Sequence, residues 1–308
     1  MPRSIGIVTA ADSRERSHGQ LHIYDGEGKG KSQAALGVVL RTIGLGICEQ
    51  RRTRVLLLRF LKGPGRAYDE DAAIEALQQG FPHLIDHLRT GRADHFTADE
   101  ATRFDREEAQ RGWVIAKGAI ASALYSVVVL DELNPVLDLG LLDVEDVVNT
   151  LRQRPEGMEI IVTGRAAPQP LIQIADLHSE MRAHRRLEPA DDTFLPYTSP
   201  GAIEIYTGEG KGKSTSALGK ALQAIGRGIS QDKSHRVLIL QWLKGGSGSP
   251  RMRQSLHYAR ATRISWIICA QGVTRSCGEA NRNRLTMWRP NGPGRLPGRP
   301  SPAVSTKP

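Results

Sequence analysis

A glycine-rich stretch followed by lysine and serine is the first feature of this chain that could do chemistry. Residues 25–32 read DGEGKGKS and lie between an apolar segment and a helical pattern. Glycines let backbone N–H groups approach an anion closely, and the start of a helix adds its positive end. The lysine would supply a charge for the outer phosphates of a nucleotide, and the serine hydroxyl could ligate Mg²⁺. The residues expected to bind nucleotide here are Gly26, Glu27, Gly28, Lys29, Gly30, Lys31, Ser32 and Gln33.

An acidic pair at the end of a second apolar segment is the expected partner of this loop. Residues 126–130 read SVVVL and run directly into Asp131 and Glu132. Parallel sheets bind ligands at the carboxyl ends of their strands, so both acids should lie near Lys31. One of the two would hold Mg²⁺ together with Ser32, and the other would orient or polarise. The sequence leaves open which acid does which. Lys31, Asp131 and Glu132 are therefore the candidate catalytic residues.

The loop occurs twice, which indicates a tandem duplication. Residues 21–47 return as residues 203–229, and RVLLLRFLKG at 54–63 returns as RVLILQWLKG at 236–245, both with an offset of 182. The second loop therefore contributes a further set of candidate phosphate-binding residues, Gly208, Gly210, Gly212, Lys213 and Ser214. It departs from the first copy by carrying Thr207 where the first has Asp25.

The elements that must position these residues alternate between strand and helix. In the first copy we expect strands at 21–24, 54–60, 126–130 and 159–163. Helices are expected at 32–43, 69–77, 98–124, 144–152 and 170–175. Such alternation predicts a fold of the α/β class, with a mostly parallel sheet covered on both faces.

Similarity between the two copies ends abruptly near residue 247. Residues 248–308 hold eleven of the 42 basic residues and one of the 33 acidic ones. The rest of the chain therefore has a net charge of −1, although the whole chain carries +9. We expect a basic tail of low order, and our hypothesis is that it is a translated wrong reading frame. The predicted organisation is an N-terminal extension (1–18), a first domain (19–187), a linker (188–200), a partial second copy (201–247) and the tail (248–308).

Several classes of protein are excluded by composition. No run of about 18 apolar residues is present, and the N-terminus lacks a signal-peptide pattern, so we expect a cytoplasmic protein without a membrane span. Three scattered cysteines do not form a disulfide framework. Because the positive charge is confined to the tail, nucleic-acid binding is not expected of the body.

Four stretches together resemble the P-loop corrinoid adenosyltransferases. They are GEGKGKS, RFLKG, the segment GWVIAKGAIASALYSVVVLDELNPVLDLGLLDVEDVV, and IIVTGRAAPQPLIQIADLHSEM. The resemblance covers about residues 19–187 and begins again at 201, and it implies a RecA-like P-loop NTPase fold. It implies that Co(I) of a corrinoid attacks the 5′ carbon of ATP, with Mg²⁺ present and triphosphate leaving. It also implies a homodimer, or here an intrachain pseudo-dimer, and a separate reductant such as a flavoprotein.

The resemblance also assigns residues outside the loop. Lys62, Asn134 and Arg165 should line the nucleotide pocket, and Phe96 should contact the corrin. Ala98 stands where the family carries an aromatic residue, which is a departure on the corrin side. Two alternatives stay open: an ATP-binding regulatory protein without catalysis, and a RecA-like ATPase acting on nucleic acid.

Overall fold

A six-stranded, entirely parallel sheet forms the centre of the molecule in the computed structural model, which describes residues 19–49, 53–92, 94–184, 203–233, 236–241 and 263–269. The strand order is β3-β2-β4-β5-β1-β6. The strands are β1 (Leu21–Asp25), β2 (Val55–Arg59), β3 (Ile85–Arg89), β4 (Val127–Asp131), β5 (Glu159–Thr163) and β6 (Leu177–Glu180). The predicted α/β fold with a parallel sheet is confirmed.

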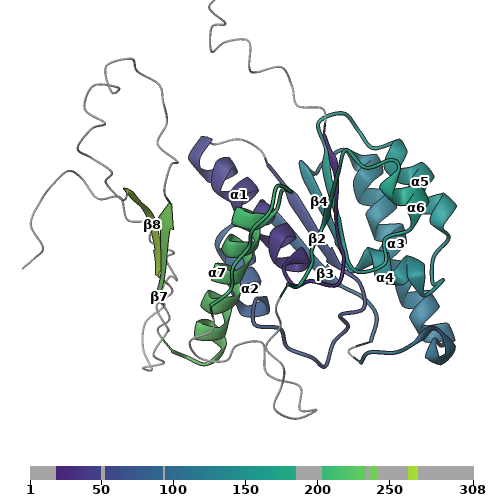
Figure 1. Cartoon of the computed structure of the whole chain (residues 1–308), viewed down its shortest axis with the longest axis horizontal. Helices are drawn as coiled ribbons and strands as arrows, with labels where there is room; N and C mark the ends of the chain where they lie inside the picture. The colour runs from purple at the N-terminus through teal and green to yellow at the C-terminus, as the bar shows by residue number, and fades with distance from the viewer. Residues whose placement is uncertain are drawn as a thin grey trace, which may run out of the picture.

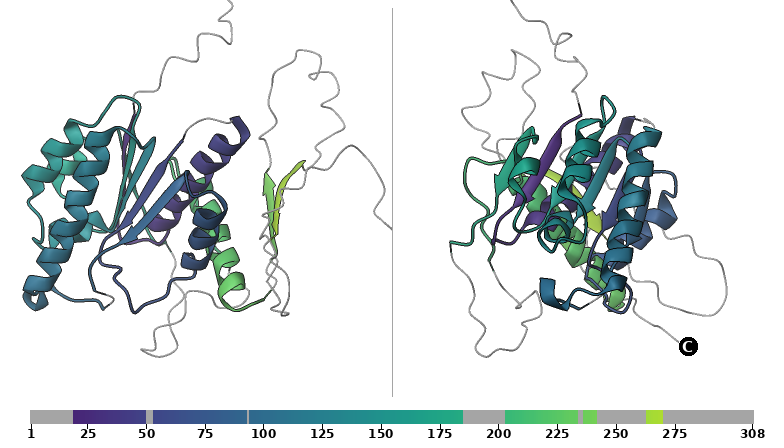
Figure 2. Two further views of the ribbon diagram at one scale, coloured as in Figure 1. Left: turned by 180° about the vertical axis from the view of Figure 1, so that it is seen from behind. Right: turned by 90° about the vertical axis from the view of Figure 1, so that its right-hand side faces the viewer.

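Helices cover both faces of the sheet (Figure 1). One face carries α3 (Arg103–Ser122), α4 (Leu133–Asp138), α5 (Val144–Arg152) and α6 (Gln169–Ile172). The other carries α1 (Lys31–Glu49) and α2 (Asp71–Gly80), and α7 (Lys213–Ser230) packs against both of them. The reverse view in Figure 2 shows the same division. Two clusters of buried apolar side chains fill the spaces between the sheet and these two helical layers.

Two strands of this sheet were not predicted. Residues 66–88 have a helical pattern, but the structure divides them into α2 and the edge strand β3. The short strand β6 lies at the opposite edge and pairs with β1. Edge strands are buried on fewer sides than central ones, so their sequences lack the continuous apolar run that identifies β2 and β4.

The helix expected at 98–124 is broken. A single 3-10 turn, η2 (Ala98–Glu100), comes first, and α3 then starts after Thr102. Thr97 with Glu100 and Thr102 with Asp105 each form a capping box, in which the threonine accepts from a backbone N–H and the acid accepts from the threonine. Two successive capping boxes therefore set the helix start five residues later than the apolar pattern suggests.

The second copy differs from the first in its opening strand. Residues 203–207, the counterpart of β1, are not in a strand, and Ile203 and Ile205 are exposed. β7 (Arg236–Gln241) pairs antiparallel with β8 (Arg263–Cys269) in a separate two-stranded sheet. A strand therefore lies within the tail that was expected to have low order. The N-terminal extension, the linker and the remainder of the tail lie outside the described residues.

Candidate nucleotide site

The loop between β1 and α1 has a backbone that requires glycine at two positions. Gly26 and Gly30 have φ angles of 95° and 115°, which residues with a Cβ rarely adopt. The N–H of Gly28 donates to the carbonyl of Met181 at 2.5 Å, which fixes the loop against the end of β6. The loop therefore presents a fixed turn at the start of α1, as a phosphate-binding loop requires.

Lys31 points back over this loop. Its ammonium donates to the carbonyl oxygens of Gly26 at 2.6 Å and Gly28 at 2.7 Å. Burial lowers the pKa of Lys31, and the carboxylate of Glu132 acts in the opposite direction. Lys31 is therefore within electrostatic reach of Glu132.

Asp131 is buried at the end of β4 and is held by groups from four elements. Lys62 lies 3.2 Å and Arg59 3.3 Å from its Oδ2, and Thr163 donates to its Oδ1 at 2.7 Å. The Ser32 hydroxyl lies close enough to this carboxylate to act on its pKa. Burial acts to raise the pKa of Asp131, but Lys62, Arg59 and the nearby hydroxyl groups hold it well below its usual range. Asp131 is therefore a permanent carboxylate near the end of the phosphate loop.

Glu132 has a different environment and a strained backbone. Its φ and ψ of 63° and 26° lie in the left-handed region, which is uncommon for a residue other than glycine and is concentrated at functional sites. Its N–H donates to Thr163 Oγ1 at 3.1 Å. Burial raises the pKa of Glu132, and the neighbouring Asp131 adds to the rise while Lys62 and Lys31 oppose it. The two adjacent acids therefore differ in how readily they take up a proton.

A buried ion cluster under Asp131 was not predicted. Arg59, the last residue of β2, is 1% exposed and also pairs with Glu70 and, at 2.8 Å, with Asp71. These two acids lie at the start of α2. A charged residue that ends an otherwise apolar strand next to β4 was the sequence signal for this cluster. Thr163, at the end of β5 between β1 and β4, was also missed, because its contact with Asp131 depends on which strands the sheet places side by side.

Three residues assigned by resemblance lie around the loop and the acids. Lys62 contacts Asp131 as described. Arg165 forms an exposed ion pair with Glu27 of the loop at 3.1 Å. Asn134 is fully buried and donates to the carbonyl of Gly164 at 3.2 Å, and among the described residues its Oδ1 has no hydrogen-bond partner. The structure therefore brings Lys62 and Arg165 to the predicted site and places Asn134 just behind it.

Other predicted residues lie elsewhere. Lys29 is exposed, whereas Gln33 is buried in the contact between α1 and α7. Phe96 packs against the core cluster that contains α3, with the Arg92 guanidinium 3.9 Å from its ring centroid, and Ala98 is exposed. The described contacts of Phe96 thus involve the core rather than the phosphate loop.

The second glycine-rich loop has the same backbone as the first. Gly208 and Gly212 have φ angles of 114° and 117°, and Lys213 donates to the carbonyl of Gly210 at 2.5 Å. Gly210 and Ser214 are exposed. The described part of the second copy contains no counterpart of β4 and its two acids.

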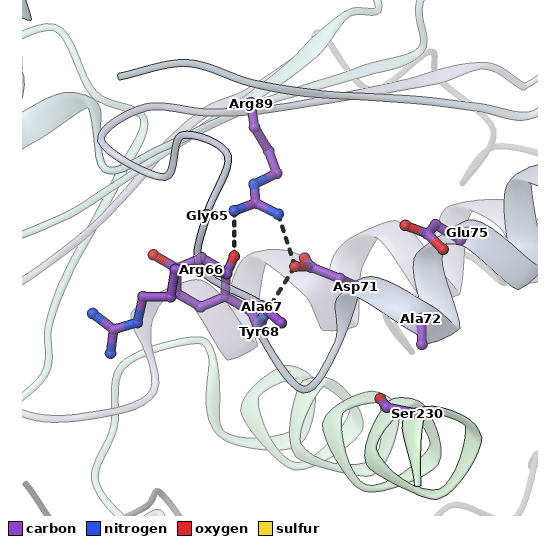
Figure 3. Close-up of a pocket in the computed structure, with 9 residues that line it drawn as sticks. All are labelled: Gly65, Arg66, Ala67, Tyr68, Asp71, Ala72, Glu75, Arg89 and Ser230. Atoms are coloured by element: carbon purple, nitrogen blue, oxygen red, sulfur yellow. Dashed lines mark hydrogen bonds and ion pairs between the residues drawn. The ribbon is translucent and has the colours of Figure 1, made fainter. Parts of the chain in front are cut away.

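A pocket of about 470 Å³ opens beside the ion cluster and is lined by residues of both copies (Figure 3). Tyr68, Asp71, Glu75 and Arg89 come from the first copy, and Ser230 comes from the end of α7. The Tyr68 ring lies within 5.4 Å of the cationic groups of Arg59, Lys62, Arg66 and Arg89. Arg89 is already committed, since it bonds to Asp71 and to three backbone carbonyls.

The residues present fit a magnesium ion only if a substrate completes its shell. Within the described ranges no three His, Cys, Asp or Glu residues form a metal cluster. Mg²⁺ is commonly held by one or two carboxylates with substrate phosphates, and Ser32 with Asp131 and Glu132 offers such a set of hard oxygen donors.

The helices that the structure describes were also compared with the length and apolarity of a membrane span. None of them is long and apolar enough to cross a membrane.

Comparison with known proteins gives consistent relatives. The model of the family described as ATP:corrinoid adenosyltransferase BtuR/CobO/CobP matches twice, over residues 17–190 and 199–287. The second match continues past residue 247, where direct similarity between the copies ends, and is about half as long as the first.

Individual relatives agree with this match. An uncharacterized protein of Nostoc sp. is 69% identical over 245 residues, which are 79% of this chain and 63% of that protein, so the chain spans less than two thirds of it. Corrinoid adenosyltransferases of Pseudomonas aeruginosa and Escherichia coli K12 are 32% and 31% identical. Both alignments cover 57% of this chain, and they cover 78% and 81% of those enzymes.

Proposed function

Because the chain belongs to the ATP:corrinoid adenosyltransferase family, we propose that its first copy transfers the 5′-deoxyadenosyl group of ATP to Co(I) of a corrinoid. In this reaction the Co(I) electron pair forms a bond to the 5′ carbon of ATP. The bond from that carbon to oxygen breaks, and triphosphate leaves with its electron pair. Cobalt is the nucleophile, so the protein needs no nucleophilic side chain of its own.

One observation carries this proposal: Lys62 lies 3.2 Å from Asp131 at the end of β4, and the Ser32 hydroxyl at the end of the phosphate loop lies close enough to lower the pKa of the same carboxylate. A departing triphosphate needs positive charge and fixed donors, which are orientational and electrostatic work. In our proposal the loop amides and Lys31 bind the triphosphate, and Lys62 and Arg165 add positive charge at its rim. Mg²⁺, when bound by Ser32 and one of the two acids, would neutralise part of the leaving group's charge.

The finer assignments are part of the same proposal. Asn134 would support the nucleotide pocket from behind, Phe96 would contact the corrin, and a separate reductant would supply Co(I). The chain would act in the cytoplasm.

We further propose that the second copy is truncated by a frameshift near residue 248. Reading the gene in its other two frames past this point should recover an acidic helical stretch. Failure to recover it in both frames would exclude the idea.

Ala98, which stands where the family carries an aromatic residue, favours one alternative, an ATP-binding regulatory protein without transferase activity. Anaerobic incubation with ATP, Mg²⁺ and chemically reduced cob(I)alamin separates the two, with loss of Co(I) absorbance as the measurement. The proposal expects turnover in the wild type and in Lys117→Ala, a surface lysine on α3, and none in Lys31→Ala. Lys213→Ala reports whether the second loop takes part. ATP binding without turnover in the wild type would favour the regulatory alternative.

A further inference from the structure

Helices α1 and α7 are repeats of one another, and they pack together with approximate two-fold symmetry. A Cβ on Gly37 would lie under 3.0 Å from the carbonyl oxygen of Thr215. A Cβ on Gly219 would lie equally close to the carbonyl oxygen of Gln33. With the offset of 182 residues, Gly37 corresponds to Gly219 and Gln33 to Thr215, so these two contacts are the same contact made in both directions. A symmetric contact of this kind is what two identical subunits form in an isologous dimer.

The symmetry extends to the two phosphate loops. A Cβ on Gly30 would lie 2.9 Å from Cε1 of Tyr206, and one on Gly212 would lie 3.2 Å from Cε1 of Tyr24. Gly30 corresponds to Gly212 and Tyr24 to Tyr206 in the repeat. Each loop is therefore covered by the tyrosine that precedes the other loop.

α7 also bonds directly to the loop of the first copy. Ser216 is fully buried, and its hydroxyl donates to the carbonyl of Gly30 at 3.1 Å. That carbonyl also accepts the first helical hydrogen bond of α1, from the N–H of Ala34 at 2.7 Å. On β1, the hydroxyl of Tyr24 lies close enough to that of Thr215 for Thr215 to oppose the rise that burial causes in the pKa of Tyr24. The second copy thus holds the phosphate loop at its last glycine and at the strand that leads into it.

Farther along, α7 reaches the ion cluster beneath Asp131. Gln223 is buried and donates to Glu70 Oε2 at 3.1 Å. Glu70 pairs through its other oxygen with Arg59, which lies 3.3 Å from Asp131. One turn later Arg227 pairs with Asp69. A continuous set of hydrogen bonds and ion pairs therefore connects the second copy to the acid at the end of β4.

The contact is symmetric at the helix crossing and one-sided beyond it. A Cβ on Gly226 would lie under 3.0 Å from the carbonyl oxygen of Asp69 in the first copy. Its counterpart on α1, Gly44, has no described atom within 4 Å of a Cβ placed there. In the described residues, the first copy is thus supported along the length of α7, and α1 gives the second copy no equivalent support at this end.

We propose that α7 serves as an internal replacement for a second subunit and that it positions the nucleotide site of the first copy, with Ser216 and Gln223 as positioning residues. The surface of α1 around Gly37 fits a second copy of the same helix, and in this chain that helix comes from the duplication. This inference rests on the proposed function only in requiring that the first copy binds ATP.

The test is ATP binding by the full chain, measured by calorimetry without corrinoid. Ser216→Ala removes one buried donor, and we expect ATP to bind about two- to tenfold more weakly. Gly219→Ala forces α7 away from α1, and we expect a loss of about tenfold. The matched control for the glycine is Gly44→Ala, which adds the same methyl group to a helix in open space.

A second control separates positioning from general stability. Ile225→Val weakens the packing of α7 at a buried apolar residue that has no polar group to offer the loop or Glu70, and it should leave ATP affinity unchanged. In steady-state assays of an active chain, Ser216→Ala should raise the KM for ATP and leave the KM for corrinoid unchanged.

Wild-type affinity in both Ser216→Ala and Gly219→Ala would overturn the inference. An equal loss of affinity in Ile225→Val would also overturn it, because α7 would then act only through stability. Failure of adenosylation in a wild type that still binds ATP would count against the proposed function and leave this comparison of affinities intact.

Discussion

The ammonium of Lys62 lies 3.2 Å from Oδ2 of Asp131, which joins the loop after β2 to the end of the neighbouring strand β4. Arg59 lies at a similar distance from the same oxygen but is also shared with two other acids. Lys62 is therefore the cation at Asp131 that a substrate phosphate could recruit without dismantling the buried cluster. The pairing of Lys62 with Asp131 should therefore affect both the stability of the protein and the way that stability depends on pH.

Replacing Lys62 with methionine should destabilise the fold by about 1–3 kcal/mol, because Asp131 stays buried with one partner fewer. Because the pKa of Asp131 is lower in the folded state than in the unfolded state, its carboxylate stabilises the fold at pH values above the unfolded pKa. This stabilisation is lost as the pH falls from the unfolded pKa through the folded pKa. Without Lys62 that folded pKa rises towards the unfolded value, so the acid-induced loss of stability should be smaller and should be complete at a higher pH. Urea unfolding across the acidic range measures this, with Lys117→Met as the surface control. Identical acid curves for Lys62→Met and wild type would contradict the assignment.

Glu132→Gln should make the protein more stable and less active. The pKa of Glu132 is raised in the folded state, so ionisation of this side chain favours the unfolded state as the pH rises through the unfolded value. A neutral glutamine avoids that cost at pH 7. If Glu132 acts on Mg²⁺ or the triphosphate, activity should fall about 10- to 100-fold. Thermal unfolding and the adenosylation rate are the two measurements, and a less stable but fully active variant would disprove both parts.

His87 on β3 should make stability depend on pH in the mildly acidic range. Burial, helped by the nearby Arg59 and Arg89, lowers the pKa of His87 to about 3. The unfolded state takes up a proton below about pH 6.5, while the folded state does so only near pH 3. Stability should therefore fall as the pH drops through this window, with a slope approaching about 1.4 kcal/mol per pH unit. In His87→Gln this contribution should be absent, whereas the exposed His83→Gln should keep it.

The parts of the fold that could be predicted from sequence are those with a strong local pattern. The sequence alone showed the apolar strands that become β1, β2, β4 and β5. It also showed the paired loops at Lys31 and Lys213. The edge strand β3 and the break before α3 were missed because they depend on pairing partners and capping rather than on apolar periodicity. At the site, the acids at 131 and 132 were predicted, but their different environments arise from side chains that the sheet order brings together.

The packing of α7 against α1 could not be predicted from the sequence pattern, because it depends on which surfaces meet in the folded chain. The sequence predicts a helix after the second loop and an apolar surface on the second copy that another element must bury. It does not show that the cover is the corresponding helix of the first copy. Glycines at Gly37 and Gly219 have the 182-residue offset of the whole repeat, and only the structure shows that they meet the same neighbours in exchanged roles.

Thr163 is the residue that fixes the two acids relative to one another, because its hydroxyl donates to Asp131 and accepts the N–H of Glu132. Thr163→Val keeps the shape of the buried side chain but removes both hydrogen bonds, and it should cost about 1–3 kcal/mol of stability. The left-handed backbone at Glu132 would lose one of its restraints, so the activity should fall more than ATP affinity does. Thr150→Val on α5, whose hydroxyl bonds only to its own helix in the described contacts, is the matched control. Urea unfolding, calorimetry with ATP and the adenosylation rate together decide the matter. Equal losses in all three would mean that Thr163 supports the fold generally, whereas a selective loss of rate would show that the geometry of the acidic pair controls the transfer step.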